Sequence, residues 1–430
     1  MGKDRFKKAS WINNTNVYEV NLRQYTAEGT INAFMREMPR LKSMGVETLW
    51  FMPLTPISQK NRKGSLGSYY ACSDYTAVNP EFGNLEDVKN LVALAHEMGM
   101  KVIIDWVANH TGWDHVWTLS NPDFYLTDSQ TGTFKIASGM DDIIELNYDQ
   151  PSMRRAMIDA MAFWIRECDI DGFRCDLAFW VRLDFWLEAR AELEKLKTMF
   201  WLAESDVLEH PAYLEAFDAA YSWSWMHKTE DFYKKKSDIG TLKNLMNQYQ
   251  EICGNNSITL WFTSNHDENS WNGTEYEKYG DMLMALNVFS FTRNGMPLIY
   301  SGQELPCRKR LAFFDKDPIE WDGRYALQEF YQKLLLLRKH HPALRAADRA
   351  VDTEIIDSGI PGHVIAFYRR HLNDGILVFL NFSEENISFQ MDISDYAGLY
   401  KDVFGELPVE FSESATIELP SWGYLVYEKI

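Results

Sequence analysis

Four apolar stretches of the sequence end in carboxylate, amide or imidazole side chains. These endings are Asp105-Trp-Val-Ala-Asn109-His110, Arg174-Cys-Asp176, Glu204-Ser-Asp206 and Asn265-His266-Asp267. An Asp or Asn at one strand end is most often a helix cap, so a single ending predicts little. Four such endings in one chain are hard to explain as caps. They indicate a site where carboxyl groups exchange protons with a substrate.

Two of these endings carry the carboxyl groups best suited to a two-step hydrolysis. Side chains alternate along a strand, so Arg174 and Asp176 face the same way, and we expect Arg174 to lower the pKa of Asp176. Glu204 ends an apolar run, a setting that raises the pKa of a carboxyl and keeps it protonated as a general acid. An ionised and a protonated carboxyl about 5–5.5 Å apart are typical of a retaining glycosidase.

The chain that must position these residues alternates short apolar strands with amphipathic helices. Strands are predicted at 17–23, 45–53, 100–106, 170–176, 199–204, 216–222, 258–264 and 297–300. Helical spacing covers 30–44, 85–98, 152–168 and 181–197. Eight repeated strand–helix units favour an α/β fold closed as a (β/α)8 TIM barrel over an open sheet. Active residues of such barrels lie where the strands end.

Two segments depart from this alternation. Between 109 and 147 the periodicity fails and polar turn residues dominate, which predicts a short excursion after the third strand. After about 346 the helical pattern is replaced by short alternating strands, which predicts an all-β sandwich. We therefore divide the chain into a catalytic barrel (1–108 and 148–345), an insertion (109–147) and a C-terminal antiparallel β domain (346–430).

Bulk composition excludes several classes of partner. The net charge of −19 repels phosphate backbones and anionic lipid, so we expect neither nucleic acid nor membrane as a partner. The five cysteines are odd in number and lack C-x-x-C spacing, which argues against a disulfide framework or a zinc site. The basic start at 1–8 has no apolar signal core, so the chain as written is expected in the cytoplasm, or outside it if a signal was removed.

The strand endings resemble the signature regions of the α-amylase family, glycoside hydrolase family 13. Asp105-x-x-x-Asn109-His110, Gly172-Phe-Arg174-x-Asp176, the strand ending at Glu204, and Asn265-His266-Asp267 are similar to its first four regions, in the same order. The segments Tyr70-Ala-Cys-Ser-Asp74-Tyr75 and Pro297-Leu-Ile-Tyr300-Ser-Gly-Gln-Glu304 look like the family's loops at the second and eighth strands. The resemblance covers about 18–321, and the β tail suits the family's C-terminal domain.

The resemblance assigns a role to each matching residue. Asp176 is the expected nucleophile, Glu204 the expected acid/base, and Asp267 the third carboxylate, which binds sugar hydroxyls and favours a distorted ring. Arg174 orients Asp176. The remaining substrate ligands implied are His110 and His266, which bond sugar hydroxyls, and Tyr70, which stacks on the sugar. Asp105 is expected to be structural.

The sequence also departs from the family pattern. Many members carry a His four residues after the nucleophile, which helps to build a calcium site, but this chain has Trp180 there. Asn109 is a possible ligand without an evident complete set, so no cofactor is required by this reading and no metal ligand is assigned. Glu145-Leu146-Asn147 and Leu177 differ from the usual choices and leave the linkage preference open.

The leading functional prediction is a retaining hydrolase of α-1,4-glucosidic bonds in starch-derived maltooligosaccharides. Alternatives of the same family are cyclodextrin or pullulan hydrolysis and transfer to a sugar acceptor, which share the glucosyl-enzyme and differ in cleft and acceptor. A non-catalytic sugar-binding homologue is a further reading, since the fold alone does not imply catalysis. The three retained carboxylates argue against it. The partner expected is an α-glucan, and the oligomeric state stays open.

Overall fold

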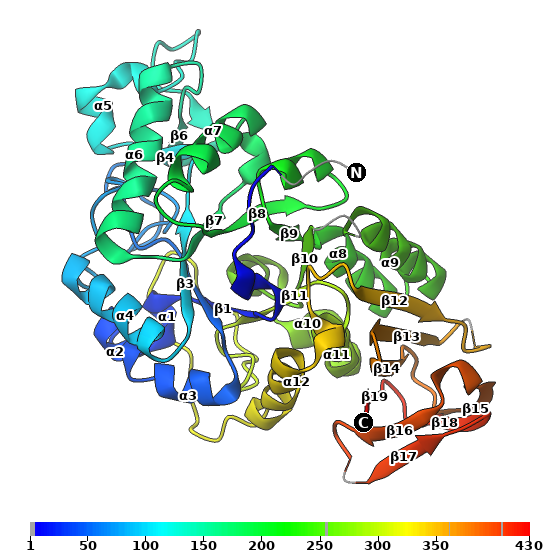
Figure 1. Cartoon of the computed structure of the whole chain (residues 1–430). Coiled ribbons are helices and arrows are strands. Elements are labelled where there is room, and N and C mark those ends of the chain that lie inside the picture. Colours follow the sequence, from blue (N-terminus) through cyan, green and yellow to red (C-terminus); the bar gives the residue numbers. More distant parts are fainter. Residues whose placement is uncertain (1–4, 254–256, 361, 406) are drawn as a thin grey trace.

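A computed structural model describes residues 5–253, 257–360, 362–405 and 407–430. Residues 1–4, part of the basic start, lie outside the described residues. Eight parallel strands close into a barrel with the order β1-β11-β10-β9-β8-β7-β3-β2 (Figure 1). The strands are β1 (Val17–Val20), β2 (Thr48–Phe51), β3 (Lys101–Trp106), β7 (Gly172–Cys175), β8 (Phe200–Asp206), β9 (Ala219–Tyr221), β10 (Ile258–Trp261) and β11 (Met296–Tyr300). The predicted TIM barrel is confirmed.

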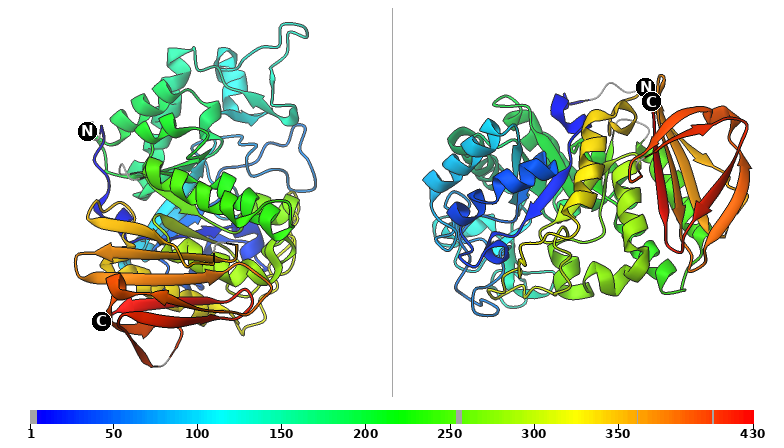
Figure 2. Two further views of the ribbon diagram at one scale, coloured as in Figure 1. Left: turned by 90° about the vertical axis from the view of Figure 1, so that its right-hand side faces the viewer. Right: turned by 90° about the horizontal axis from the view of Figure 1, so that it is seen from below.

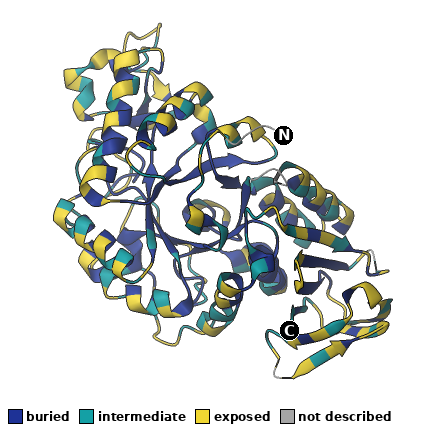
Figure 3. Cartoon of the chain, in the orientation of Figure 1, coloured by how far each residue is buried: buried dark blue, intermediate teal, exposed yellow. Residues whose placement is uncertain are grey.

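Helices surround the barrel and bury the outward faces of its strands, while side chains that fill the barrel interior bury the inward faces. Figure 3 shows the central strands buried and the outward faces of the helices exposed. The longer helices are α4 (Leu85–Glu97), α6 (Pro151–Cys168), α7 (Leu183–Leu193), α8 (Trp223–Tyr233), α9 (Ile239–Cys253), α11 (Leu283–Thr292) and α12 (Gln328–His340). Short helices are α1 (Leu22–Tyr25), α2 (Ile31–Met35), α3 (Met38–Met44) and α10 (Glu275–Tyr279). Burial on both faces explains why the strands read as unbroken apolar runs.

Two predicted elements of the first unit differ in the structure. The strand predicted at 17–23 ends at Val20, and α1 begins at Leu22. The helix predicted at 30–44 is two helices, α2 and α3, separated by Arg36 and Glu37. Pro39 lies in the first turn of α3, where its missing N–H costs nothing, but it has no N–H to continue a hydrogen-bond ladder from α2.

The segment between β3 and α6 forms a small antiparallel sheet in place of a structureless loop. Its strands are β4 (His110–Gly112), β6 (Met140–Glu145) and β5 (Ile136–Ala137), in the order β4-β6-β5. The short helix α5 (Val116–Ser120) lies within the same segment. Figure 1 places these elements at the far end of the molecule from the C-terminal strands. We call residues 109–147 the insertion. Its limits, and those of the other two domains, remain proposals.

The C-terminal strands form the two sheets of a sandwich. The six-stranded sheet has the order β12-β13-β14-β19-β16-β17, and β15 pairs with β18. These strands are β12 (Val351–Ile356), β13 (Val364–His371), β14 (Asp374–Asn381), β15 (Ile387–Asp392), β16 (Gly398–Asp402), β17 (Pro408–Phe411), β18 (Ser414–Leu419) and β19 (Tyr424–Lys429). Figure 2 shows this module packed against one side of the barrel.

Alternation along β13 explains how the sandwich joins the barrel. Ile365 and Phe367 belong to the large barrel core, whereas Val364, Ala366 and Tyr368 belong to the core between the two C-terminal sheets. Successive side chains of a strand face opposite sides, so a strand buried on both faces needs this unbroken apolar run. No helix among the described residues is long and apolar enough to span a bilayer.

Candidate active site

Three carboxyl groups from separate strand ends line one pocket at the carboxyl end of the barrel. Asp176 follows β7, Glu204 lies in β8, and Asp267 lies in the loop after β10. All three line a cavity of 410 Å³, together with Tyr70 and His110. Asp176 and Glu204 are each 6% exposed. The structure therefore brings together residues that are 91 positions apart in the chain, from Asp176 to Asp267.

Arg174 connects the acidic groups from beneath the pocket. Its Nη1 lies 3.0 Å from an oxygen of Asp105 and 3.0 Å from an oxygen of Asp176, and its Nη2 lies 2.9 Å from Oε1 of Glu204. The guanidinium is fully buried and also lies over the Trp50 ring, 4.9 Å from its centroid. Sequence reasoning paired Arg174 with Asp176 alone. The structure shows one cation shared among three carboxyl groups.

Arg174 lowers the pKa of Asp176, as predicted, but the net shift of that pKa is upward. Burial and the neighbouring Glu204 carboxyl raise the pKa of Asp176 well above its usual range, although Arg174 opposes them. One positive charge cannot hold three buried carboxyls fully ionised, because each carboxylate also repels the others. Without a bound substrate, Asp176 consequently keeps its proton to a higher pH than a free aspartic acid does.

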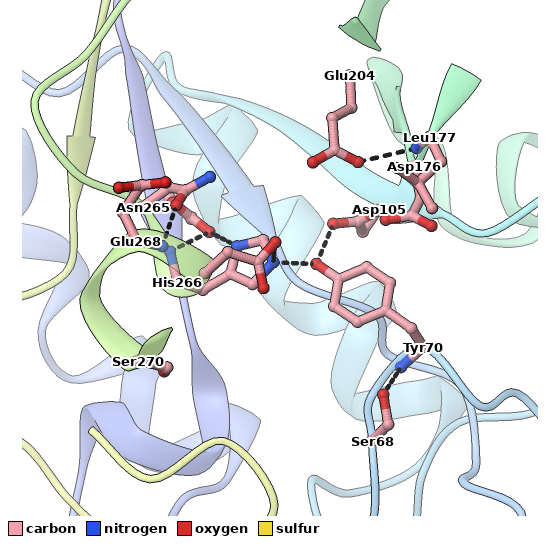
Figure 4. A network of polar contacts seen from close by, with 12 residues as sticks. Ser68, Tyr70, Asp105, Asp176, Leu177, Glu204, Asn265, His266, Glu268 and Ser270 are labelled. Atoms are coloured by element: carbon pink, nitrogen blue, oxygen red, sulfur yellow. Dashed lines mark hydrogen bonds and ion pairs between the residues drawn. The ribbon is translucent and has the colours of Figure 1, made fainter. Parts of the chain in front are cut away.

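Glu204 is held by a strained residue that follows Asp176. Its Oε2 accepts a hydrogen bond of 2.8 Å from the backbone N–H of Leu177. Leu177 has a φ of 39°, a left-handed conformation that is rare for a residue with a bulky side chain. Strain of this kind persists where surrounding contacts impose it, and it is common at functional sites. Here it aims a backbone N–H at the carboxyl of Glu204 (Figure 4).

A second network links Tyr70, His266 and Asp105. The Tyr70 hydroxyl donates to Asp105 Oδ2 at 3.1 Å and lies 2.7 Å from Nε2 of His266 (Figure 4). Burial raises the pKa of Asp105 to about 6, against the lowering effect of Arg174. Tyr70 is buried apart from a face on the pocket, and its ring stacks on that of His266.

Glu19 was missed by sequence reasoning. It lies in β1 and is fully buried, and its Oε1 contacts Nδ1 of His266. Although burial lowers it, the carboxylates of Asp267 and Glu19 raise the pKa of His266 well above its usual range. The signal available in the sequence was an acidic residue within the apolar run Val17-Tyr-Glu-Val20, where Tyr and Glu alternate faces.

His110 and His266 occupy different environments. His110 is 2% exposed, its Nε2 has no hydrogen-bond partner among the described residues, and burial lowers the pKa of His110 to about 4. It therefore presents a neutral ring nitrogen to the pocket. Both ring nitrogens of His266 have protein partners, and Nε2 lies 3.3 Å from Asp267 as well as beside Tyr70.

Several residues that sequence reasoning did not single out also line the pocket. They are Lys63, Ser68, Met140, Asp142, Ile143, Trp271, Phe313 and Phe314. Trp271 is 53% exposed, and its ring centroid lies 5.3 Å from that of Phe313. Three of them lie in β6 of the insertion, Trp271 lies in a short helical turn, and the others lie in loops. None belongs to a segment with the strand–helix alternation of the barrel, so the sequence pattern carried no information on their spatial neighbours. An exposed indole in a cleft suits the apolar face of a sugar.

Comparison with known proteins decides the family. The family model for the α-amylase catalytic domain matches residues 4–125 and 121–322. The chain belongs to the α-amylase family. Among solved structures, this chain is similar to the noncanonic maltogenic α-amylase AmyB of Thermotoga neapolitana. It is 29% identical with a TM-score of 0.87, over 97% of this chain and 99% of that one.

Two relatives of this chain have names that state different activities. Alpha-amylase 2 of Dictyoglomus thermophilum is 24% identical over 419 residues, which are 90% of this chain and 69% of that protein. A cyclomaltodextrinase of Geobacillus thermopakistaniensis is 25% identical over 447 residues, covering 93% of this chain and 70% of that protein. The family is thus established, whereas the preferred α-glucan is a matter for proposal.

A residue that helps to build the calcium site of many α-amylase family members is replaced by Trp180 here. Asn109 and Trp180 line the same 420 Å³ pocket beside the insertion, and the indole of Trp180 offers no oxygen ligand. Calcium takes six to eight oxygen ligands. Across the described ranges, no group of three His, Cys, Asp or Glu side chains is placed to hold a metal ion. No step of the chemistry is derived through calcium.

Proposed function

We propose that this protein hydrolyses α-1,4-glucosidic bonds in maltooligosaccharides with retention of configuration, using Asp176 as nucleophile and Glu204 as acid/base. The observation that carries the proposal is the shared guanidinium: Arg174 contacts both carboxyl groups, and both line one pocket. A retaining mechanism requires two carboxyls close together on a single sugar, one ionised and one protonated.

Each carboxyl acts twice in the proposed cycle. Asp176 attacks the anomeric carbon while Glu204 gives its proton to the departing glucosidic oxygen, and a glucosyl ester on Asp176 results. Glu204, now ionised, takes a proton from water, which attacks the same carbon and releases Asp176. The Leu177 N–H and Arg174 hold Glu204 in place through both steps. Arg174 is buried and acts on the sugar through these carboxyls.

The remaining residues position the sugar at the reacting carbon. Asp267, whose side chain is 39% exposed, binds sugar hydroxyls, and Tyr70 supplies a flat ring against the sugar. His110 offers its unpartnered Nε2 to a hydroxyl. His266 binds a sugar hydroxyl through Nε2. To do so, Nε2 gives up its contact with the Tyr70 hydroxyl. Such placement contributes by holding the reacting atoms in line.

A product analysis tests the proposal and separates its variants. Maltoheptaose, pullulan and β-cyclodextrin are each incubated with the protein, and products are resolved by chromatography and NMR. We expect maltoheptaose to give shorter maltooligosaccharides whose new reducing ends appear first as the α-anomer. β-anomers would indicate inversion, and new bonds formed with added glucose would indicate transfer. Absence of products from all three substrates would support the non-catalytic alternative.

A further inference from the structure

The loop between β2 and α4 is tied to the insertion at two points. The carboxylate of Asp114 accepts hydrogen bonds from the backbone N–H groups of Gln59 at 2.9 Å and Lys60 at 3.1 Å. Lys63 then pairs with Asp141 at 3.1 Å and with Asp142 at 2.8 Å. Lys63 and Asp142 both line the pocket that holds the three carboxyls. The ion pair of Lys63 with Asp142 therefore joins the loop between β2 and α4 to strand β6 of the insertion, at the edge of the site.

The same loop is tied on its other side to the segment after β11. The N–H of Ser65 donates to Asp315 at 2.9 Å, and the N–H of Leu66 donates to the carbonyl of Phe314 at 3.0 Å. Residues 58–68, 140–143 and 311–315 thus form a continuous rim, which we call the wall. Its members Lys63, Asp142, Phe313 and Phe314 face the pocket.

The wall is a fixed part of the fold. Beneath it, the fully buried guanidinium of Arg23 donates to the carbonyls of Gly67 at 3.0 Å and Phe313 at 3.4 Å. At Gly64, which has a φ of 61°, a Cβ would lie 2.4 Å from Cβ of Phe314. Two of the three wall segments, 58–68 and 311–315, are thus in close contact and share a buried cation, which opposes their separation.

The position of the wall relative to the reacting bond indicates which end of a bound sugar chain lies toward the wall. In the proposed mechanism Glu204 protonates the oxygen of the departing sugar on the reducing side, so the sugar bound by Tyr70 and Asp267 lies on the non-reducing side of the bond. Phe313 of the wall lies nearly parallel to Tyr70, with ring centroids 6.3 Å apart, and Trp271 lies against Phe313. Figure 4 shows Ser68, which ends the first wall segment, beside Tyr70 and away from Glu204.

We propose that the wall stops the non-reducing end of the substrate, so that the protein acts on free chain ends and releases short maltooligosaccharides. The pocket volume of 410 Å³ lies in the lower part of the range for small-molecule sites, about 300–1,000 Å³, and suits a chain end better than a passing polymer. This inference rests on the proposed function and adds the substrate class: linear α-1,4-glucan with an unblocked non-reducing end.

The test compares two forms of one substrate. 4-Nitrophenyl maltoheptaoside is supplied with a free non-reducing end or with that end blocked by an ethylidene group, and cleavage is followed by chromatography. We expect the free form to react at least about tenfold faster, because the blocked end cannot fit against the wall. Equal rates would overturn the proposal. Cleavage of neither form would instead count against the proposed hydrolase activity.

Variants assign the effect to the wall. Lys63→Met removes the ion pairs with Asp141 and Asp142, one of the two links to the insertion, and Asp315→Ala removes the hydrogen bonds to Ser65. Each is expected to raise the rate on the blocked form relative to the free form several-fold, and the double variant more. Lys135→Met is the matched control, because Lys135 pairs with Glu145 in the insertion and lines none of the active pocket. If both wall variants fold and leave the ratio unchanged, the wall does not exclude the blocked end.

Discussion

At the scale of single residues, the site depends on the balance of one cation against three carboxyl groups. Arg174 is fully buried, and its partners Asp105, Asp176 and Glu204 are nearly so. Buried charges are tolerated when they are paired and hydrogen-bonded, and removal of one member leaves the others uncompensated. The surplus of negative charge explains why the pKa of Asp176 rises although a guanidinium is adjacent.

Asp176→Asn is expected to remove turnover while the pocket keeps its shape. The amide cannot form the glucosyl ester, so kcat for maltoheptaose should fall on the order of 10⁴-fold or more. Binding of maltoheptaose, measured by calorimetry, should change little, because Asn is close to Asp in size. Ser205→Ala, at a buried residue outside the pocket lining, serves as the control. A variant with the wild-type rate would show that Asp176 is not the nucleophile.

Loss of the cation should move the acidic limb of the pH–rate profile. Protonated Asp176 cannot attack, so kcat/KM falls as the pH drops through the pKa of Asp176. Arg174 lowers that pKa, and Arg174→Met removes the lowering, so the limb should shift to higher pH. Arg174→Lys, which keeps a charge, should shift it less. An acidic limb at the same pH in all three proteins would contradict the electrostatic role given to Arg174.

At the scale of elements, strand β7 positions the site because its neighbours approach it closely. Gly172 pairs with Phe200 of β8 and lies beside Ile103 of β3. A Cβ at position 172 would lie 2.1 Å from the carbonyl oxygen of Phe200 and 3.0 Å from Cγ2 of Ile103. The carbonyl oxygen of Phe200 belongs to the backbone of β8, so it cannot turn away from a new Cβ as the end of a side chain can. The spacing of β7 and β8 in turn sets how Arg174 meets Glu204.

Gly172→Ala should therefore disturb both stability and activity. Overpacking costs about 1–3 kcal/mol, and displacement of β7 should also reduce kcat. Gly240→Ala is the matched control, because in α9 the nearest atom to a new Cβ is Oδ1 of Asp238 at 3.1 Å, the end of a side chain. Thermal denaturation and maltoheptaose turnover measure the two effects. Equal behaviour of the two variants would mean that β7 and β8 separate without cost.

At the scale of the whole molecule, the C-terminal sandwich and the barrel share one apolar core. Phe367 of β13 is fully buried within the barrel core, and its ring lies 6.1 Å from that of Phe289 in α11. Ile376, Val378 and Leu380 of β14 join the same core. The interface is thus a continuation of the barrel interior, and we expect the two parts to unfold together.

Phe367→Ala should lower the stability of the barrel and the sandwich alike. The cavity left by a buried Phe costs about 3–5 kcal/mol, which should appear as a lower temperature of one calorimetric transition. Leu372→Ala is the control, because Leu372 is 78% exposed and its change should be small. Two separate transitions, of which only one moves, would show that the parts unfold independently.

The sequence by itself was enough for the barrel architecture, and it also named three acidic residues that the structure brings to one pocket, whose catalytic roles stay proposals. Eight apolar runs alternating with amphipathic helices allow few folds, since each face must be buried against another layer. The strand endings also gave the order of the signature regions. The sequence pattern was insufficient at two places. Near Pro39 one predicted helix is two helices in the structure, and in the insertion the polar turn residues gave no sign that β4 pairs with β6.

Only the tertiary structure decided how the charges balance and where the pocket ends. The pairing of Arg174 with Glu204, the contact of Glu19 with His266, and the bridge from Lys63 to Asp142 each join segments that are distant in the chain. Sequence patterns report the faces of one element, whereas a pKa depends on every charge within reach in space. For that reason the raised pKa of Asp176 and the wall follow from the closed barrel and could not be predicted from the sequence.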